Sequence, residues 1–305
     1  MGINERNIAF ISRYNERKKF PLVDNKLLTK HAAEQAGIAV PALLGVVESP
    51  YQLNTLSQLL DPLEEFVVKP TRGSGGKGIL VISRRENGKF VKPGGQALDL
   101  SYIRHYISNI LSGVYSLGGK PDTAFIEALV HCVPTLDQYS YEGLPDIRVI
   151  LFKGFPVMAM LRCPTHGSDG KANLHQGAVG VGIDVTTGRA LNAVQNNIVV
   201  HSHPDTGVDF SDLAIPDWDV LVRLAASCYE LTGLGYLGCD IVVDRDRGPL
   251  ILELNARPGL SIQTASGIGL RDRLRTIEKL PSGDWSIEER LAYIIKQFGA
   301  TQRAA

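Results

Sequence analysis

The stretch FVVKPTRGSGGKGILVI, residues 66–82, places a glycine-rich loop between two apolar runs. Its glycines satisfy the spacing G-x-G-x-x-G, which marks a Rossmann dinucleotide site when a strand leads through the loop into a helix. Here a β-branched run, residues 79–83, follows the glycines and has no helical period. A P-loop is excluded too, because Ile79 follows Gly78 and no Gly-Lys-Ser/Thr leads into a helix. The order is therefore strand, glycine loop, strand.

Two interpretations of this strand–loop–strand unit stay open. In one, the glycine N–H groups form a flexible flap that closes over a triphosphate, and Lys69 sets its ammonium group against the phosphates. In the other, the loop is a flexible hairpin turn and Lys69 lies on the surface. The glycine spacing alone does not separate them.

The composition narrows the class of protein. The chain has 305 residues, 44% of them hydrophobic, and its 32 basic and 32 acidic side chains leave no net charge. This length suits two or three lobes with their own cores, and the neutral balance argues against a nucleic-acid partner. No apolar run reaches the ~20 residues of a membrane span, and the N-terminus has no secretory core. Four cysteines without a C-x-x-C spacing are typical of reduced thiols, so we expect a cytoplasmic protein.

Local patterns predict the main elements. Residues 1–20 are expected to be a solvated segment, and residues 23–41 a helix capped by Asp24. Further helices are expected at residues 50–60, 97–117, 216–232 and 286–298. Strands are expected at residues 42–47, 66–70, 78–83 and 123–130, and hairpins at 146–162 and 239–259, with a polar, turn-rich segment at 164–178.

The second hairpin places two carboxylates opposite each other. If its turn is residues 244–249, then Val243 faces Leu250 across the ladder. Counting outward from that pair, Asp240 faces Glu253. Directly opposite residues on one face of a sheet have Cβ atoms ~5 Å apart.

Asn255 lies two residues beyond Glu253 and so projects from the same face as the two carboxylates. Two unpaired carboxylates at this spacing repel each other by roughly 3 kcal/mol at an effective dielectric near 20. A divalent cation removes this penalty, and an all-oxygen set of Asp, Glu and Asn suits magnesium or manganese. The alternative is that Asp240 or Glu253 pairs with Arg245 or Arg257 of the protein itself.

The order of these segments resembles the ATP-grasp superfamily, and specifically the RimK-type α-L-glutamate ligases. The resemblance covers residues 22–272 and rests on seven segments in order: DNKLLTKHAAEQAGIAVP, FVVKPTRGSGGKGI, FIEALV, DIRVILFKG, KANLHQGA, GCDIVV and LELNARPGL. It implies an α+β fold in which two α+β lobes grip ATP, after a truncated N-terminal region. The expected parts are a helical segment at 1–44, a small lobe with the flap at 45–128, a C-terminal lobe with the metal site at 129–280, and a helix and tail at 281–305.

The resemblance also implies roles for individual residues. Those expected to bind ATP are Lys26 and Lys69, the flap residues Gly73, Ser74, Gly75, Gly76 and Gly78, the hinge residues Glu127, Ala128 and Leu129, and Asp146, Lys171 and Asn173. Those expected to be catalytic are Arg148 and Arg162, near the γ-phosphate or an acyl phosphate, with Asn255 and Arg257. The expected ligands of Mg²⁺ or Mn²⁺ are Asp240, Glu253 and Asn255, the same three that the pairing count selects.

The activity so implied is that of an ADP-forming acid–amino-acid ligase. ATP would phosphorylate a small-molecule or peptide carboxylate, and an amino-acid amine would attack the acyl phosphate. Two alternatives stay open: a non-catalytic nucleotide-binding or scaffold protein, and a kinase of the same fold. RimK-type ligases usually carry a complete lobe where this chain has some 20 residues, which leaves open a homo-oligomer or a membrane-protein partner.

Overall fold

The computed structural model describes residues 1–73, 75–116, 118–281 and 283–299. The chain divides into two compact units, which are described separately below. Unit 1 comprises Met1–Asp24, His31–Val40 and His131–Ala305, and unit 2 comprises Asn25–Lys30 and Pro41–Val130. Among the described residues, no helix combines the length and the apolar character that crossing a bilayer requires.

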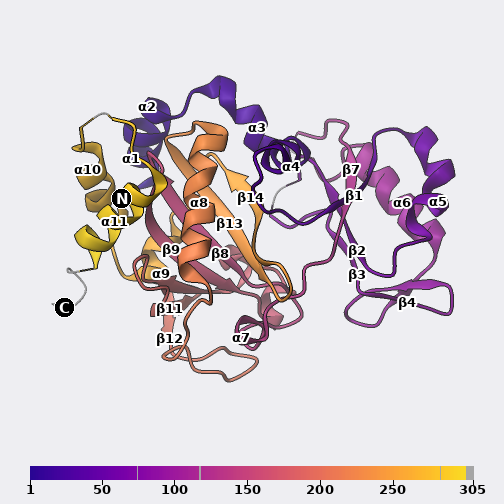
Figure 1. The fold of residues 1–305 in the computed structure, drawn as a ribbon. Helices are drawn as coiled ribbons and strands as arrows, with labels where there is room; N and C mark the ends of the chain where they lie inside the picture. The colour runs from indigo at the N-terminus through magenta and orange to yellow at the C-terminus, as the bar shows by residue number, and fades with distance from the viewer. Residues whose placement is uncertain (74, 117, 282, 300–305) are drawn as a thin grey trace. The chain divides into compact units, whose positions relative to one another are not determined.

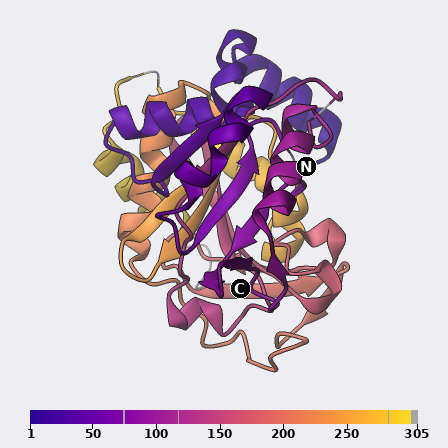
Figure 2. The same ribbon diagram turned by 90° about the vertical axis from the view of Figure 1, so that its right-hand side faces the viewer.

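Unit 2 is built on a four-stranded antiparallel sheet in the order β1-β7-β2-β3. Figure 1 labels these strands, and Figure 2 shows the same ribbon turned by 90°. Its strands are β1 (Leu43–Val47), β7 (Ala124–Glu127), β2 (Phe66–Pro70) and β3 (Leu80–Ile82), with β4 (Arg84–Glu86), β5 (Lys89–Val91) and β6 (Ala97–Leu98) in a smaller sheet. Its helical segments are η3 (Pro50–Thr55), α5 (Leu56–Leu60) and α6 (Leu100–Leu111). Apolar residues of these helices, including Leu60 and Ile103, form one core with Phe66 and Ile82 of the sheet.

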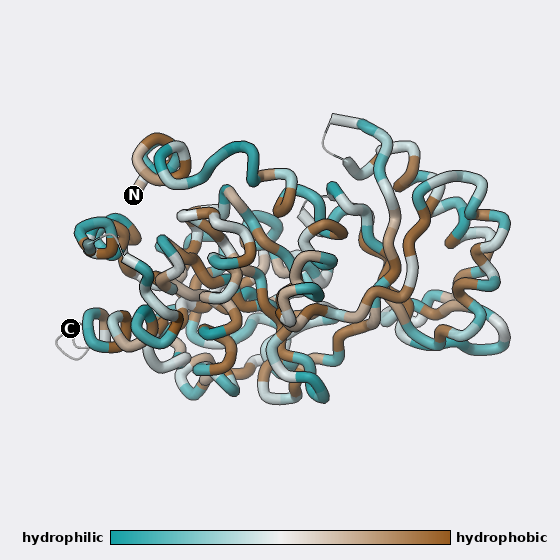
Figure 3. Tube along the Cα trace, turned by 45° about the horizontal axis from the view of Figure 1, so that its top comes forward, coloured by the Kyte–Doolittle hydropathy of each residue, from teal (hydrophilic) through white to brown (hydrophobic). Residues whose placement is uncertain are grey.

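Unit 1 is built on a seven-stranded antiparallel sheet in the order β12-β11-β10-β9-β8-β13-β14. Its strands are β8 (Asp146–Phe152), β9 (Phe155–Cys163), β10 (Val179–Ile183), β11 (Ala190–Gln195), β12 (Ile198–Val200), β13 (Tyr236–Asp244) and β14 (Gly248–Asn255). Its longer helices are α8 (Trp218–Thr232), α9 (Ser261–Ser266), α10 (Leu270–Glu278) and α11 (Ile287–Phe298), with short turns at α7 (Pro134–Asp137), η4 (His166–Ser168) and η5 (Leu174–Gln176). Figure 3 shows hydrophobic (brown) and hydrophilic (teal) stretches alternating along the chain.

The two faces of this sheet differ, which is what positions the site. Because side chains alternate along a strand, Ile147 and Val149 point into the core that α8 covers. On the opposite face, Ile150 and Phe152 pack under the N-terminal and C-terminal helices. Asp146 begins the same strand at the other end of this second face. The second face is therefore apolar along one part and polar along the rest.

The N-terminal segment differs from its expectation. Residues 1–20 are not merely solvated: they form α1 (Ile3–Glu5), the π-helix η1 (Arg6–Ile11), α2 (Ser12–Tyr14) and the 3₁₀ turn η2 (Arg17–Lys19). Phe10 is fully buried and meets the ring of Phe152 edge to face at 5.5 Å. The prediction was wrong because it weighed the many polar residues and missed this apolar anchor.

The helix expected at residues 23–41 is divided at Asn25 into α3 (Phe20–Asp24) and α4 (Lys26–Gln35). The side chain of Asn25 accepts hydrogen bonds from the N–H groups of Leu27 and Leu28, at 3.0 and 3.1 Å. The cap is therefore Asn25, and the prediction of Asp24 was wrong by one residue.

This difference predicts a measurable contrast. Asn25→Ala should lower the free energy of unfolding by about 1 kcal/mol, because two helix N–H groups lose their acceptor. Asp24→Ala should cost less than about 1 kcal/mol, because its exposed carboxylate makes only a surface ion pair with Arg257. Urea unfolding of the two variants checks this, and a larger loss for Asp24→Ala would contradict the assignment of the cap.

Most other elements form where the sequence predicts them. The strands at 42–47, 66–70, 78–83 and 123–130 are confirmed as β1, β2, β3 and β7, and the first hairpin as β8 and β9. Lys153 and Gly154 form its turn, and both have positive φ, 50° and 80°, as a two-residue hairpin turn requires. The helices expected at 97–117, 216–232 and 286–298 are α6, α8 and α11 with shorter bounds.

Candidate functional site

The hairpin of β13 and β14 brings the two expected carboxylates into register. Asp240 pairs directly with Glu253, as predicted. Val243, however, pairs with Pro249, so the predicted partner Leu250 is wrong by one residue. A bulge in β14 reconciles the two results: Asp240 pairs with Glu253 and the next residue of β13 pairs with Ile251, which restores the expected register.

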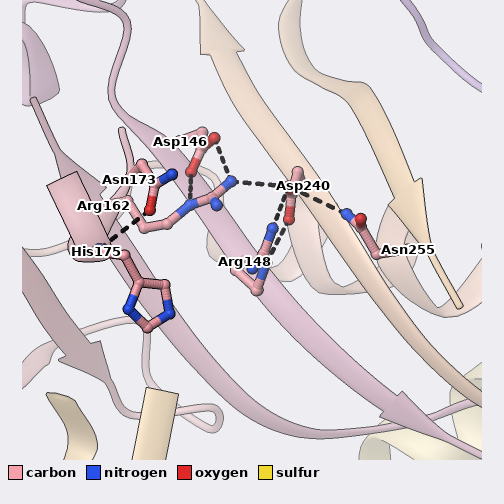
Figure 4. Close-up of polar contacts among 7 residues, drawn as sticks. All are labelled: Asp146, Arg148, Arg162, Asn173, His175, Asp240 and Asn255. Carbon is pink, nitrogen blue, oxygen red and sulfur yellow. Dashed lines mark hydrogen bonds and ion pairs between the residues drawn. The ribbon is translucent and has the colours of Figure 1, made fainter. Parts of the chain in front are cut away.

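The side chain of Asp240 accepts hydrogen bonds from three other side chains (Figure 4). It is 3% exposed. Arg148, its neighbour across β8, donates from Nε to Oδ1 at 2.7 Å and from Nη2 to Oδ2 at 2.6 Å. Arg162 donates from Nη2 to Oδ2 at 2.8 Å, and the Nδ2 group of Asn255 donates to the same oxygen at 3.3 Å. The buried carboxylate thus binds two guanidinium groups.

Arg162 extends this network to a second carboxylate. It pairs across β9 and β8 with Asp146, and its Nε and Nη2 atoms donate to the two oxygens of Asp146 at 2.5 Å each. Figure 4 shows these side chains converging on one face of four adjacent strands. We call Asp146, Arg148, Arg162, Asp240 and Asn255 the polar cluster.

The two carboxyl groups of the polar cluster have opposite pKa shifts. Burial alone raises the pKa of Asp240, but the guanidinium groups of Arg148 and Arg162 outweigh burial and hold it well below the ordinary value. Burial raises the pKa of Asp146, and the nearby charge of Asp240 adds to this increase against the opposing effect of Arg162. Asp240 is therefore the stronger acid and carries its negative charge more firmly.

The alternative in which Asp240 pairs with Arg245 or Arg257 is wrong. Asp240 pairs with Arg148 and Arg162, whereas Arg245 lies 3.2 Å from Asp246 in the turn. Arg257 donates to Asp24 at 3.4 Å, and its guanidinium lies 4.9 Å from the ring centroid of Phe20. The structure thus does not bring Arg257 into the polar cluster, and its catalytic role stays a prediction.

The polar segment 164–178 lies next to Arg162. Gly180 is the pairing partner of Arg162 in β10, and the side chain of Leu174 covers Gly180. Beside Leu174, the Oδ1 atom of Asn173 accepts the backbone N–H of His175 at 3.0 Å (Figure 4). Lys171, in the same segment, extends its ammonium to Asp169 at 2.8 Å. Asn173 therefore caps a turn at the edge of the polar cluster.

Unit 2 carries a buried ion triad. Glu127, at the end of β7, is 3% exposed and binds the ammonium groups of both Lys69, on β2, and Lys30, on α4. The Lys30 ammonium lies 2.9 Å from Oε2 of Glu127 and also donates to the carbonyl of Pro41. Burial raises the pKa of Glu127, but the two lysines outweigh burial and lower it below the ordinary value. The triad contains two cations and one anion.

The base of the glycine loop is tied to α4. Lys26 donates from its ammonium to the carbonyl of Gly73 at 2.8 Å, and its backbone N–H donates to the carbonyl of Thr71 at 3.0 Å. Gly73 forms a bridge with Ser116. Gly75, Gly76 and Gly78 all have positive φ, from 63° to 79°, a conformation that favours glycine. Ser74 lies outside the described residues.

Two groups near these residues were missed by the sequence analysis. Lys30 lies one helical turn after Lys26, and this i, i+4 spacing on one face was the available signal. Asp122 is 7% exposed, accepts from the hydroxyl of Thr71, and accepts from the N–H of Arg72 at 3.0 Å. The sequence gives no comparable signal for Asp122.

Some polar groups of the predicted hinge, residues 127–129, already bond to other residues of the protein. The N–H of Ala128 donates to the carbonyl of Ala42 at 2.9 Å, and Leu129 is half-buried. The side chain of Glu127 is held by its lysines. A contact to an adenine edge would therefore need the remaining backbone groups of this segment.

The three predicted metal ligands have a suitable chemistry. Asp240 and Glu253 lie directly opposite each other, and Asn255 is within hydrogen-bond distance of Asp240. Within the described ranges, no group of three or more His, Cys, Asp and Glu side chains is placed to hold a metal. The predicted set contains only two such side chains, and its third ligand is an amide. The donor set therefore fits a hard dication, and metal binding stays a prediction.

The family follows from a comparison with known proteins. The family model described as sugar-transfer associated ATP-grasp matches residues 5–279. The chain therefore belongs to this family and has the ATP-grasp fold, which confirms the predicted superfamily and α+β class. The finer assignment to RimK-type glutamate ligases stays a prediction. No curated protein matches the sequence of this chain.

Several solved structures resemble the chain distantly. D-cycloserine synthetase DcsG has 16% identity and a TM-score of 0.47, over 85% of this chain and 70% of its own. The D-alanine–D-alanine ligase of Coxiella burnetii has 14% identity and a TM-score of 0.47, over 94% and 62%. The ATP-grasp ligase PsnB, solved with a precursor variant, Mg and ADP, has 16% identity and a TM-score of 0.45, over 87% and 62%. The chain thus spans less than two thirds of the length of the Coxiella burnetii ligase and of PsnB.

Proposed function

We propose that the protein is an ATP-dependent ligase that joins a carboxylate to an amine through an acyl phosphate. The observation that carries this proposal is the polar cluster, where two half-buried arginines and the buried Asp240 lie beside Glu253. Such a cluster combines guanidinium groups, which bind phosphate, with carboxylates, which bind a dication. Membership of the ATP-grasp family supports the use of ATP.

The residues of unit 1 would act on the transferring phosphoryl group. Arg148 and Arg162 would bind its oxygens and stabilise the charge that develops during transfer. Asp240, Glu253 and Asn255 would hold Mg²⁺ or Mn²⁺. When bound, the cation would neutralise phosphate oxygens.

The residues of unit 2 would bind other groups of the nucleotide. The triad of Lys30, Lys69 and Glu127 has one more cation than anion, and a phosphate would offset that charge. Lys26 already holds the base of the glycine loop and would add a further cation near it. The loop, rich in positive-φ glycines, would supply N–H groups to an anion.

Transfer to a carboxylate needs positioned cations and exclusion of water more than a protein nucleophile. In the ligase reaction, the carboxylate oxygen attacks the γ-phosphorus and ADP leaves. The amine nitrogen then attacks the acyl carbon, loses a proton and releases phosphate. We propose an amino acid such as glutamate as one of the two substrates.

Product analysis tests the proposed function. The protein is incubated with Mg-ATP and pairs drawn from amino acids, short peptides and, because the family is described as sugar-transfer associated, amino sugars. We expect ADP and phosphate to form in equal amounts only when an acid and an amine are both present, together with an amide product. Mass spectrometry of the product identifies the pair.

Two other outcomes would contradict the ligase proposal. ADP accompanied by a stable phosphorylated product would identify a kinase. Tight binding of nucleotide without turnover for any pair would favour a non-catalytic nucleotide-binding or scaffold protein.

A further inference from the structure

Both oxygens of the Asp240 carboxylate already accept hydrogen bonds from other side chains. Oδ1 accepts from Nε of Arg148 at 2.7 Å, and Oδ2 accepts from Arg148, Arg162 and Asn255 at 2.6, 2.8 and 3.3 Å. The Asp240 side chain is only 4% exposed. A cation that approaches Asp240 must therefore compete with two positively charged guanidinium groups, those of Arg148 and Arg162.

The side-chain amide of Asn255 is also oriented unfavourably for metal binding, because its nitrogen and not its oxygen faces Asp240. Its nitrogen donates to Asp240, so its oxygen is on the other side of the amide plane. To ligate a cation together with Asp240, the amide must rotate and present its oxygen. This rotation gives up the hydrogen bond to Asp240, so it becomes favourable only when something else occupies that carboxylate.

The charges of the five residues of the polar cluster balance without any ligand, and the carboxylate of Glu253, opposite Asp240, lies outside this count. Asp146 and Asp240 are matched by Arg148 and Arg162. A free dication would add two positive charges beside two guanidinium groups. A phosphate group changes this balance, because the guanidinium groups can bind it as an alternative bidentate partner. The oxygens of Asp240 then become available to the cation.

We propose that this site selects the metal–phosphate complex over the free metal, and that Arg148 sets the selection by holding Asp240 until phosphate arrives. The proposal rests on the proposed function and specifies the ligand that its metal site accepts. By linkage, a phosphate that weakens the contact between Arg148 and Asp240 raises the affinity for metal, and metal raises the affinity for phosphate by the same factor.

The test measures the affinity of the protein for Mn²⁺ in the absence of nucleotide. The electron paramagnetic resonance signal of free Mn²⁺ monitors the binding. We expect the wild-type protein to bind Mn²⁺ weakly in the absence of nucleotide. Arg148→Gln should bind Mn²⁺ alone more tightly, by about 5- to 150-fold, which is the usual range of coupling between two ligands. A gain in affinity from the loss of a side chain is not expected of a merely structural arginine.

Arg247→Gln is the matched control. Arg247 also pairs with a buried aspartate of β13, donating to Asp244 at 3.0 Å. The control also removes one positive charge beside β13. It does so at the turn between β13 and β14, several paired residues away from Asp240 and Glu253. Its affinity for Mn²⁺ alone should equal that of the wild-type protein.

A more conservative variant, Arg148→Lys, allows the test to be made even if Arg148→Gln does not fold. Arg148→Lys keeps one positive charge but replaces two parallel hydrogen bonds with a single ammonium contact, so it should shift Mn²⁺ affinity in the same direction by a smaller factor. Thermal unfolding gives a second measurement, since Mn²⁺ alone should raise the melting temperature of the Arg148 variants more than that of the wild type.

The outcomes separate this proposal from the proposed function. Equal affinity for Mn²⁺ alone in the wild type and both Arg148 variants would overturn the selection by Arg148. If a non-hydrolysable ATP analogue also failed to bring Mn²⁺ onto the wild-type protein, the metal site and the proposed function would fail with it.

Discussion

Glu253→Gln should lower ATP-dependent turnover by about 10²- to 10³-fold, the loss typical of removing one group that stabilises transferring charge. Glu253 lies directly opposite Asp240, and the substitution keeps its shape while removing its charge. A glutamine oxygen is a weaker ligand for a dication than a carboxylate. The affinity for adenosine, which has no phosphate, should stay unchanged.

The measurement is ADP release at increasing Mn²⁺ concentration, alongside equilibrium binding of adenosine. Excess Mn²⁺ should restore part of the activity, because the variant weakens metal binding without deleting the site. Glu288→Gln is the control, since Glu288 is an exposed carboxylate of unit 1 that pairs with Arg223. Normal turnover by Glu253→Gln would show that the metal assignment is wrong.

Glu127→Gln should lower the free energy of unfolding by about 3–5 kcal/mol, the usual cost of removing one partner from a buried ion pair. The substitution leaves the ammonium groups of Lys30 and Lys69 buried without their carboxylate. Urea unfolding measures the loss. Glu86→Gln, which removes an exposed carboxylate paired with Arg84 in the same unit, should change stability by less than about 1 kcal/mol.

The same triad predicts a pH dependence. The folded-state pKa of Glu127 lies below its ordinary value of 4.5, so the unfolded chain binds more protons at low pH. The stabilisation from the triad is therefore present above pH 4.5 and declines as the pH falls through the folded-state pKa. Glu127→Gln should lose this dependence. A variant as stable as the wild type at neutral pH would contradict the role of the triad.

Much of the fold could be predicted because its signals are local. Alternation of apolar residues indicates β2, β8 and β13, and a short polar turn between two such runs indicates a hairpin. The pairing of Asp240 with Glu253 follows from counting along one hairpin. The count reached the right pair although the bulge in β14 had shifted the turn by one residue.

The parts that could not be predicted depend on contacts between distant segments. Phe10 is buried against Phe152, 142 residues further along the chain, and no local pattern in residues 1–20 indicates such a partner. The same holds for Arg162, which lies 78 residues before Asp240. The phosphate-binding role that we propose for Arg162 comes from family resemblance, whereas its hydrogen bond to Asp240 could be found only from the order of strands in the sheet.

The proposed metal–phosphate site can be tested with a crystal structure that contains a non-hydrolysable ATP analogue and Mn²⁺, in which anomalous scattering locates the Mn²⁺. We predict Mn²⁺ bound within roughly 2.0–2.2 Å of oxygens of Asp240, Glu253 and Asn255, with Arg148 turned from Asp240 to a phosphate. Nucleotide bound with no Mn²⁺ at these three side chains, and with Arg148 still on Asp240, would contradict it.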